Sequence, residues 1–191
     1  KLPLIDVRSP GEYEKGHIPQ AVNIPLFTNK ERAHVGTVYV QESKERAIEL
    51  GYQYVTPKLG WFIDDSRKLT GSNSVAVHCW RGGMRSHAFA SHLHSNGFDE
   101  VFVINGGYKA YRNYVLQSFE KPVHLHILGG YTGSGKTQIL KQMKERGEQV
   151  IDLEQLAHHK GSAFGAIGET MQPTVEQFEN NLFTEWRKFN F

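Results

Sequence analysis

Short apolar runs alternate with segments of helical pattern over the first 118 residues. Residues 2–7, 75–78 and 100–104 are apolar runs that end in turns, which predicts strands. Helical patterns follow these runs, at residues 10–16, 86–95 and from 107 to about 116. A second extended segment lies at 18–25. Because strands alternate with helices, the pattern predicts an α/β domain with a parallel sheet and flanking helices.

The alternation resumes after a predicted linker at 117–123. Residues 123–128 and 149–153 are predicted as strands, and residues 136–146 as the helix between them. We expect one domain at 1–118 and a second beginning at 119. About 70 residues remain for the second, which is short for an α/β domain. We therefore expect residues 119–191 to be the N-terminal, incomplete part of a larger domain.

Residues 28–70 are more polar and give a weaker pattern. Within them, residues 42–50 are predicted to form a charged helix with a solvated face, which ends at Gly51. Trp61 and Phe62 are expected to pack in the core or in a groove.

Composition limits the classes of function. Hydrophobic residues make up 39% and charged residues 22% of the 191 residues, which is typical of a globular protein. The net charge of +2 is too small to indicate nucleic acid by itself. No run approaches the roughly 18–20 apolar residues of a membrane span, and no signal peptide is visible, so we expect a cytoplasmic protein without membrane contact. One cysteine excludes an intrachain disulfide framework and a multi-cysteine metal site, and we expect no haem, flavin or zinc.

The single cysteine, Cys79, lies between a predicted strand and a predicted helix. The loop after it contains Trp80, Arg81, Gly82, Gly83, Met84 and Arg85. Glycines let successive N–H groups turn inward, and the N-terminus of the next helix favours an anion. Arg85 adds a bidentate donor and Arg81 adds charge, so the loop favours a nucleophilic thiolate. A merely buried cysteine would not need two arginines and two glycines in this order.

A second glycine-rich loop precedes the helix predicted at 136–146. Gly130, Gly133, Ser134, Gly135, Lys136 and Thr137 fit the pattern Gly-x4-Gly-Lys-Thr between a strand and a helix. Backbone N–H groups would cradle phosphates, Lys136 would meet their charge, and Thr137 could hold Mg²⁺. Asp152 is a candidate second metal ligand, but a structural role at a strand end or as the N-cap of a helix explains this residue equally well.

The first domain resembles the rhodanese family. The segments that carry the resemblance are 4–13, 16–25 and 105–108. In such domains Asp6 and Arg8 resemble structural residues that brace the fold near the reactive loop. Rhodanese sulfurtransferases usually have a loop one residue shorter than Cys-x5-Arg, whereas phosphatases and arsenate reductases of the superfamily use the longer one. The loop of this chain is therefore expected to hold a phosphate-sized anion.

The combination of both loops resembles one family, the tRNA 2-selenouridine synthases. The supporting segments are 32–37, 79–86, 129–137, 152–165 and 172–173. Lys160 stands where the family usually has arginine, so an anion-binding role there loses the bidentate fork.

The resemblance implies a tRNA-modifying transferase that replaces sulfur by selenium in wobble 2-thiouridine. Selenophosphate would supply the selenium, and geranyl diphosphate would first activate the sulfur. Implied partners are tRNA and an enzyme that supplies selenophosphate. Two alternatives stay open: a Cys-x5-Arg phosphatase or arsenate reductase fused to a nucleotide-binding domain, and a non-catalytic rhodanese module. The presence of Cys79 argues against the non-catalytic module, which would normally lack this cysteine.

Overall fold

The structure, a computed structural model, describes residues 2–71, 73–131, 133–160, 165, 168 and 170–189. The chain forms two compact units, residues 1–113 and 114–191. The boundary between them falls inside one helix, α6 (Gly107–Phe119). Each unit is described by itself.

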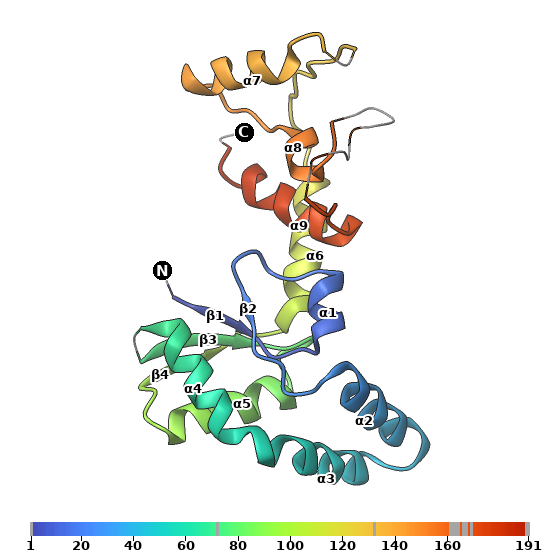
Figure 1. Ribbon diagram of the computed structural model, residues 1–191, viewed down its shortest axis with the longest axis vertical. Helices are drawn as coiled ribbons and strands as arrows, with labels where there is room; N and C mark the ends of the chain where they lie inside the picture. The colour runs from blue at the N-terminus through green and yellow to red at the C-terminus, as the bar shows by residue number, and fades with distance from the viewer. Residues whose placement is uncertain are drawn as a thin grey trace. The chain divides into compact units, whose positions relative to one another are not determined.

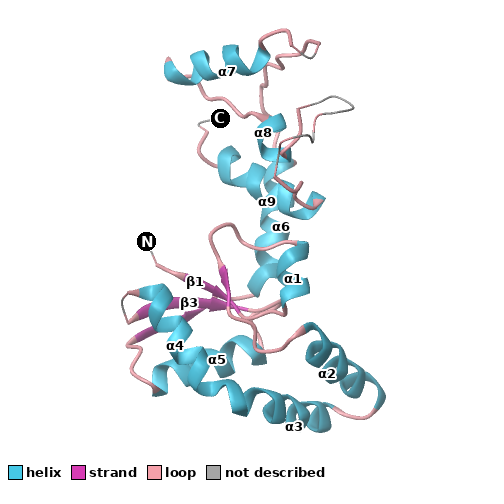
Figure 2. Ribbon diagram, in the orientation of Figure 1, coloured by secondary structure: helices cyan, strands magenta, loops and turns pink. Residues whose placement is uncertain are grey.

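The first unit is built on a four-stranded parallel sheet. Its strands are β1 (Leu4–Asp6), β2 (Val22–Asn23), β3 (Ser74–His78) and β4 (Glu100–Val103), in the order β2-β1-β3-β4 (Figures 1 and 2). In the register, Ile5 lies opposite Val22 on one side and opposite Val77 on the other. The α/β prediction with a parallel sheet is confirmed for this unit.

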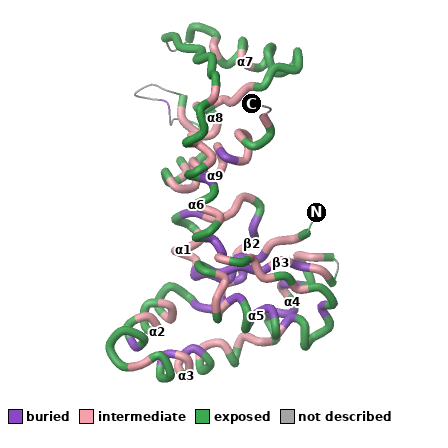
Figure 3. Tube along the Cα trace, turned by 180° about the vertical axis from the view of Figure 1, so that it is seen from behind, coloured by how far each residue is buried: buried purple, intermediate pink, exposed green. Residues whose placement is uncertain are grey.

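Helices cover both faces of this sheet. The helices α4 (Leu59–Thr70) and α5 (Met84–Ser95) lie on one face, and α1 (Pro10–Lys15) and the start of α6 lie on the other (Figure 1). The core between the sheet and α4–α5 consists mainly of buried apolar side chains, together with the buried Ser66 and Ser86, and Figure 3 shows the burial of the strands. It includes Phe62 and Phe89, whose rings meet at 5.3 Å. The expectation that Phe62 packs in the core is confirmed.

The polar stretch after β2 is more helical than its pattern predicts. It forms α2 (Asn29–Gln41), α3 (Lys44–Val55) and a short 3₁₀ turn, η1 (Thr56–Lys58), before α4 begins. The prediction that a helix ends at Gly51 is wrong. Gly51 is buried inside α3, next to the Phe27 ring, and the helix continues through it to Val55.

The second unit contains three further helices in its described residues. They are α7 (Lys136–Glu145), α8 (Leu153–Ala157) and α9 (Val175–Trp186). The end of α6 packs against α9 through two edge-to-face pairs, Tyr114–Phe183 and Phe119–Trp186, each with centroids 5.6 Å apart. The predicted linker therefore starts too early, because α6 continues to Phe119.

The two strands predicted for the second unit are not formed. Residues 123–128 and 149–152 have no regular secondary structure. A strand is stable only when a neighbouring strand takes up its backbone hydrogen bonds, and the described residues of this unit provide none. In the described part of the chain, no helix combines the length and the apolar character needed to cross a membrane.

Candidate active site

Cys79 follows the last residue of β3 and belongs to the buried core. Alternate residues of a strand face the same side, so Val75, Val77 and Cys79 point into the core beneath α4 and α5. The Cys79 Sγ atom lies 3.3 Å from the Oγ atom of Ser86, in the first turn of α5. The Ser86 hydroxyl also lies 3.0 Å from the carbonyl oxygen of Gly83. Because the hydroxyl has one hydrogen, it can donate either to that carbonyl or to the cysteine sulfur.

Two glycines bring the cysteine loop against the start of α6. Gly82 and Gly107 have φ angles of +65° and +57°, which other residues rarely adopt. A Cβ on Gly107 would overlap the Cys79 carbonyl and the Gly82 nitrogen. This close approach lets the N–H groups of Tyr108 and Lys109 donate to the carbonyl oxygens of Cys79 and Trp80, both at 2.9 Å. The loop is therefore held by backbone bonds that need glycine at both positions.

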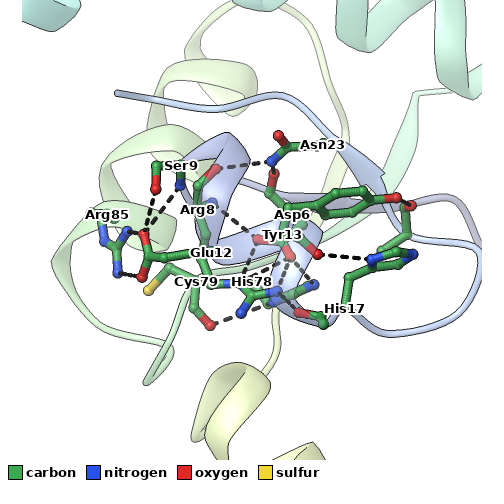
Figure 4. Close-up of polar contacts among 12 residues, drawn as sticks. Asp6, Arg8, Ser9, Glu12, Tyr13, His17, Asn23, His78, Cys79 and Arg85 are labelled. Carbon is green, nitrogen blue, oxygen red and sulfur yellow. Dashed lines mark hydrogen bonds and ion pairs between the residues drawn. The ribbon is translucent and has the colours of Figure 1, made fainter. Parts of the chain in front are cut away.

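Arg85 is held by a carboxylate from a distant part of the chain. Its two terminal nitrogens donate to the two oxygens of Glu12, at 2.8 and 3.3 Å (Figure 4). Glu12 also accepts from the Ser9 backbone at 3.1 Å, and its carboxylate lies 3.6 Å from Arg32 Nε. Arg85 is thus paired with Glu12, and its expected bidentate contact with an anion in the loop stays a prediction. No local pattern in the sequence predicts these contacts of Glu12, Arg32 and Ser86.

The surroundings of Cys79 favour its ionised form. Burial raises the pKa of the thiol, but hydrogen bonds from the Ser86 side chain and backbone, and then the charge of Arg85, lower it more. The net effect is a Cys79 pKa below its ordinary value. The pKa of the Glu12 carboxyl is also lowered, because burial raises it but Arg85, the Ser9 backbone and Arg32 together lower it more. The charge of Arg85 thus favours the ionised forms of both Cys79 and Glu12.

Asp6 and Arg8 form a buried ion pair beside the loop. Two Arg8 nitrogens contact the Asp6 carboxylate at 2.6 and 3.0 Å, and Nη2 also donates to the Gly16 carbonyl at 2.8 Å (Figure 4). The guanidinium lies 3.9 Å above the centre of the Tyr108 ring. His78 Nε2 lies 3.7 Å from Asp6, and burial lowers the pKa of His78. These contacts fit the bracing role that the rhodanese resemblance implies.

The other residues of the cysteine loop are more accessible. Trp80, Arg81 and Met84 are exposed, whereas Gly82, Gly83 and Arg85 are half-buried. Their roles in binding an anion stay predictions.

The glycine-rich loop of the second unit precedes α7, as the sequence predicts. Lys136 Nζ donates to the carbonyl oxygens of Gly130 and Tyr131, at 2.8 and 3.1 Å. Thr137 is exposed in the first turn of α7. Asp152 caps α8 by accepting from the Gln155 backbone at 3.0 Å. Among the described residues, no group of three or more His, Cys, Asp or Glu side chains could hold a metal ion.

Replacing Ser86 with alanine should raise the pKa of Cys79 and slow its alkylation at neutral pH. The variant loses a hydrogen bond to the thiolate while the burial that raises the pKa remains. Iodoacetamide alkylation followed by mass spectrometry against pH measures the shift directly. The acid limb of the rate should move to higher pH. An alkylation profile identical to that of the unmodified chain would show that Ser86 does not stabilise the thiolate.

Two family models match the chain. The model for a rhodanese-like domain matches residues 1–114, and the model for the tRNA 2-selenouridine synthase AAA domain matches residues 123–190. The two matches lie side by side in the sequence and correspond to the two halves that carry the cysteine loop and the glycine-rich loop.

Curated relatives are similar to the chain over nearly all of its length. The tRNA 2-selenouridine synthase of Sulfurovum sp. (strain NBC37-1) is 42% identical over 189 residues, covering 94% of this chain and 49% of that protein. The protein of the same name from Bdellovibrio bacteriovorus is 41% identical and covers 96% and 49%. The chain thus spans about half the length of the curated relatives it matches. A crystal structure of an N-terminal domain from Clostridium difficile 630 is 42% identical with a TM-score of 0.55, covering 61% of this chain and 90% of that one.

Proposed function

Because the chain belongs to the tRNA 2-selenouridine synthase family, we propose that it is part of a tRNA-modifying transferase. The reaction replaces the sulfur of wobble 2-thiouridine in tRNA by selenium. The names of the relatives support the reaction class, and the Cys79 loop supports an anionic donor. The proposed partners are tRNA and an enzyme that supplies selenophosphate, and the proposed location is the cytoplasm.

The proposed selenium donor is selenophosphate, bound in the loop from Cys79 to Arg85. The Cys79 thiolate attacks the phosphorus atom, so that an S–P bond forms and the P–Se bond breaks. Hydrogen selenide leaves as its anion, and water then hydrolyses the phosphocysteine to phosphate and free thiol. The released selenide attacks C2 of the activated thiouridine, and the sulfur leaves as a thiol that takes the proton of the selenide.

The observation that carries this proposal is the Cys79–Ser86–Arg85–Glu12 arrangement. It lowers the pKa of Cys79, which provides the nucleophile. It also keeps Glu12 ionised next to Arg85, which makes this carboxyl a poor proton donor. An alkoxide leaving group of a phosphate ester needs a proton from a general acid, whereas hydrogen selenide is a weak base and can leave without one. The arrangement therefore favours selenophosphate over a phosphate monoester.

The second unit is proposed to bind geranyl diphosphate. The loop with Gly130, Gly133, Ser134 and Gly135 would hold the diphosphate, with Lys136 exchanging its bonds to loop carbonyls for phosphate oxygens. The thiouridine sulfur attacks C1 of the geranyl group, so that a C–S bond forms, the C–O bond breaks and diphosphate leaves with the N3 proton of the thiouridine. This alkylation converts the sulfur into a leaving group for the selenide step.

Mg²⁺ would neutralise part of the charge on the leaving diphosphate. Thr137, in the first turn of α7, is the proposed ligand. Asp152 is a weaker second ligand, because its carboxylate caps α8 and would have to give up the Gln155 N–H.

Mass spectrometry of tRNA nucleosides tests the function. Cells grown with selenium should contain 2-selenouridine derivatives when the gene for the full-length protein is present and lack them when it is deleted. Returning the gene should restore the modified nucleoside. An unchanged level of selenouridine in the deletion strain would refute the proposal.

A further inference from the structure

A large cavity opens between the helical pair α2–α3 and the Cys79 loop. Its volume is about 940 Å³, at the upper end of the roughly 300–1,000 Å³ typical of small-molecule sites. The helices α2 and α3 pack against each other and project beyond the sheet of the first unit (Figure 1). All the lining residues belong to this unit, and Cys79 is one of them.

Exposed apolar side chains gather at this cavity. Tyr39, Val40, Tyr52, Trp80 and Met84 line it, with exposed fractions of 58%, 82%, 60%, 38% and 54%. Side chains of this size are usually buried, and an exposed group of them marks a binding surface. Deeper parts of the wall are also apolar and include Phe27, Val35, Ala47, Ile48 and Val55. The cavity therefore fits a hydrocarbon group.

The charged residues that line the cavity are all cationic. They are Arg32, Lys44, Arg81 and Arg85, and the lining contains no aspartate or glutamate. Gly36 leaves room for Arg32, because a Cβ at this position would lie 2.7 Å from an Arg32 guanidinium nitrogen. A wall that is apolar and also carries several cations fits a ligand with both a hydrocarbon chain and negative charge.

We propose that this cavity binds the hydrocarbon chain of an S-alkylated 2-thiouridine nucleotide. This inference rests on the proposed function. The carbon that exchanges sulfur for selenium has to lie within reach of the Cys79 loop. A chain joined to that carbon through one sulfur atom must then enter the space next to Cys79, which is this cavity. The cationic side chains of the same wall, of which Arg32 and Arg85 also contact Glu12, would receive the nucleotide's phosphate.

The proposal is tested by binding to the 191-residue chain. The probes are S-geranyl-2-thiouridine 5′-monophosphate and its S-methyl analogue, compared by titration calorimetry. Because apolar burial strengthens binding with each added carbon, the geranyl probe should bind at least about 30-fold more tightly. Equal affinities for the two probes would contradict a site for the chain.

Variants locate the site. The double substitution Val40→Asp with Tyr52→Asp places charge in the cavity at two exposed positions, so the fold should survive. It should weaken the geranyl probe at least about tenfold and the S-methyl analogue less, because both probes meet the added negative charge but only the geranyl probe loses apolar contacts. Val175→Asp is the control, since Val175 is a comparably exposed helical valine, at 77%, in the other unit. Unchanged affinity in the double variant would overturn the assignment.

Geranyl diphosphate is the third probe, because it also combines a chain with negative charge. If the double variant loses binding of this compound but keeps that of the geranyl nucleotide, the cavity serves the donor and the proposal is wrong. Selenouridine formation by the full-length protein distinguishes failure of the proposed function from failure of this inference. Failure of the proposed function means that the unmodified enzyme makes no selenouridine. Failure of this inference means that the double variant makes it at the unmodified rate.

Discussion

Replacing Cys79 with serine should abolish selenide release from selenophosphate, with a loss of at least about 1,000-fold, as for other removed nucleophiles. Serine is close to cysteine in size and can keep the contact with Ser86, so the buried site should stay folded. Its hydroxyl is not ionised near neutral pH and is a weak nucleophile without an adjacent base. Phosphorus NMR of selenophosphate incubated with the chain measures the rate.

The pH dependence provides an internal check on this result. The lowered pKa of Cys79 means that the thiolate persists below the range of an ordinary thiol. The rate of the unmodified chain should therefore fall only when the pH drops through this lowered pKa. Circular dichroism should give the same spectrum for both proteins. Selenophosphate consumption by the serine variant at the unmodified rate would remove Cys79 from the mechanism.

Replacing Arg8 with alanine should destabilise the first unit by about 3–5 kcal/mol. The substitution leaves the Asp6 carboxylate fully buried without its main cation, and it also removes the bond to Gly16 and the contact with Tyr108. A buried charge that has lost its partner pays the full cost of desolvation. Urea denaturation followed by circular dichroism measures the change in the free energy of unfolding.

Arg46 supplies the matched control for this prediction. It also pairs with carboxylates, Glu49 at 2.9 Å and Glu42 at 3.9 Å, but its side chain is 61% exposed. Exposed pairs of this kind contribute about 0–1 kcal/mol, so Arg46→Ala should have little effect. Equal losses of stability in the two variants would show that burial does not determine how much the Asp6–Arg8 pair contributes to the free energy of unfolding.

The elements around Cys79 were predictable because their signals are local. An apolar run that ends in a cysteine, two glycines and a helical pattern all lie within about 20 residues, and β3, the loop and α5 follow them closely. The same holds for the start of α7 after the second glycine-rich loop. In each case one short segment contains both the chemistry and the turn that positions it.

Of the helical pair beside the cavity, α3 overlaps the helix predicted at 42–50, whereas α2 was missed for a physical reason. Val38 is the buried residue of α2, so that helix has almost no apolar stripe for periodicity to detect. Its one clear signal is the capping box between Thr28 and Glu31, where each side chain accepts from the other's backbone. The cavity itself arises where separate elements meet, which no local pattern contains.

The partner of Arg85 was missed because it is distant in sequence. Glu12 precedes Arg85 by 73 residues and reaches it only when α1 and α5 pack around the same loop. A pattern of Ser9 followed by Glu12 is visible in the sequence, but it indicates only the start of a helix. In the second unit the sequence pattern predicts an element that does not form. The alternating residues in 123–128 predict a strand, but a strand forms only beside a neighbouring strand.

The isolation of Cys79 has a consequence for the redox chemistry of this chain. A thiolate is oxidised by peroxide to a sulfenic acid, which many proteins rescue by forming a disulfide with a nearby second cysteine. The 191 residues contain no other cysteine, so this chain has no resolving thiol of its own. Its return to the reduced state depends on an external thiol, and without one further oxidation to the sulfinic acid is irreversible.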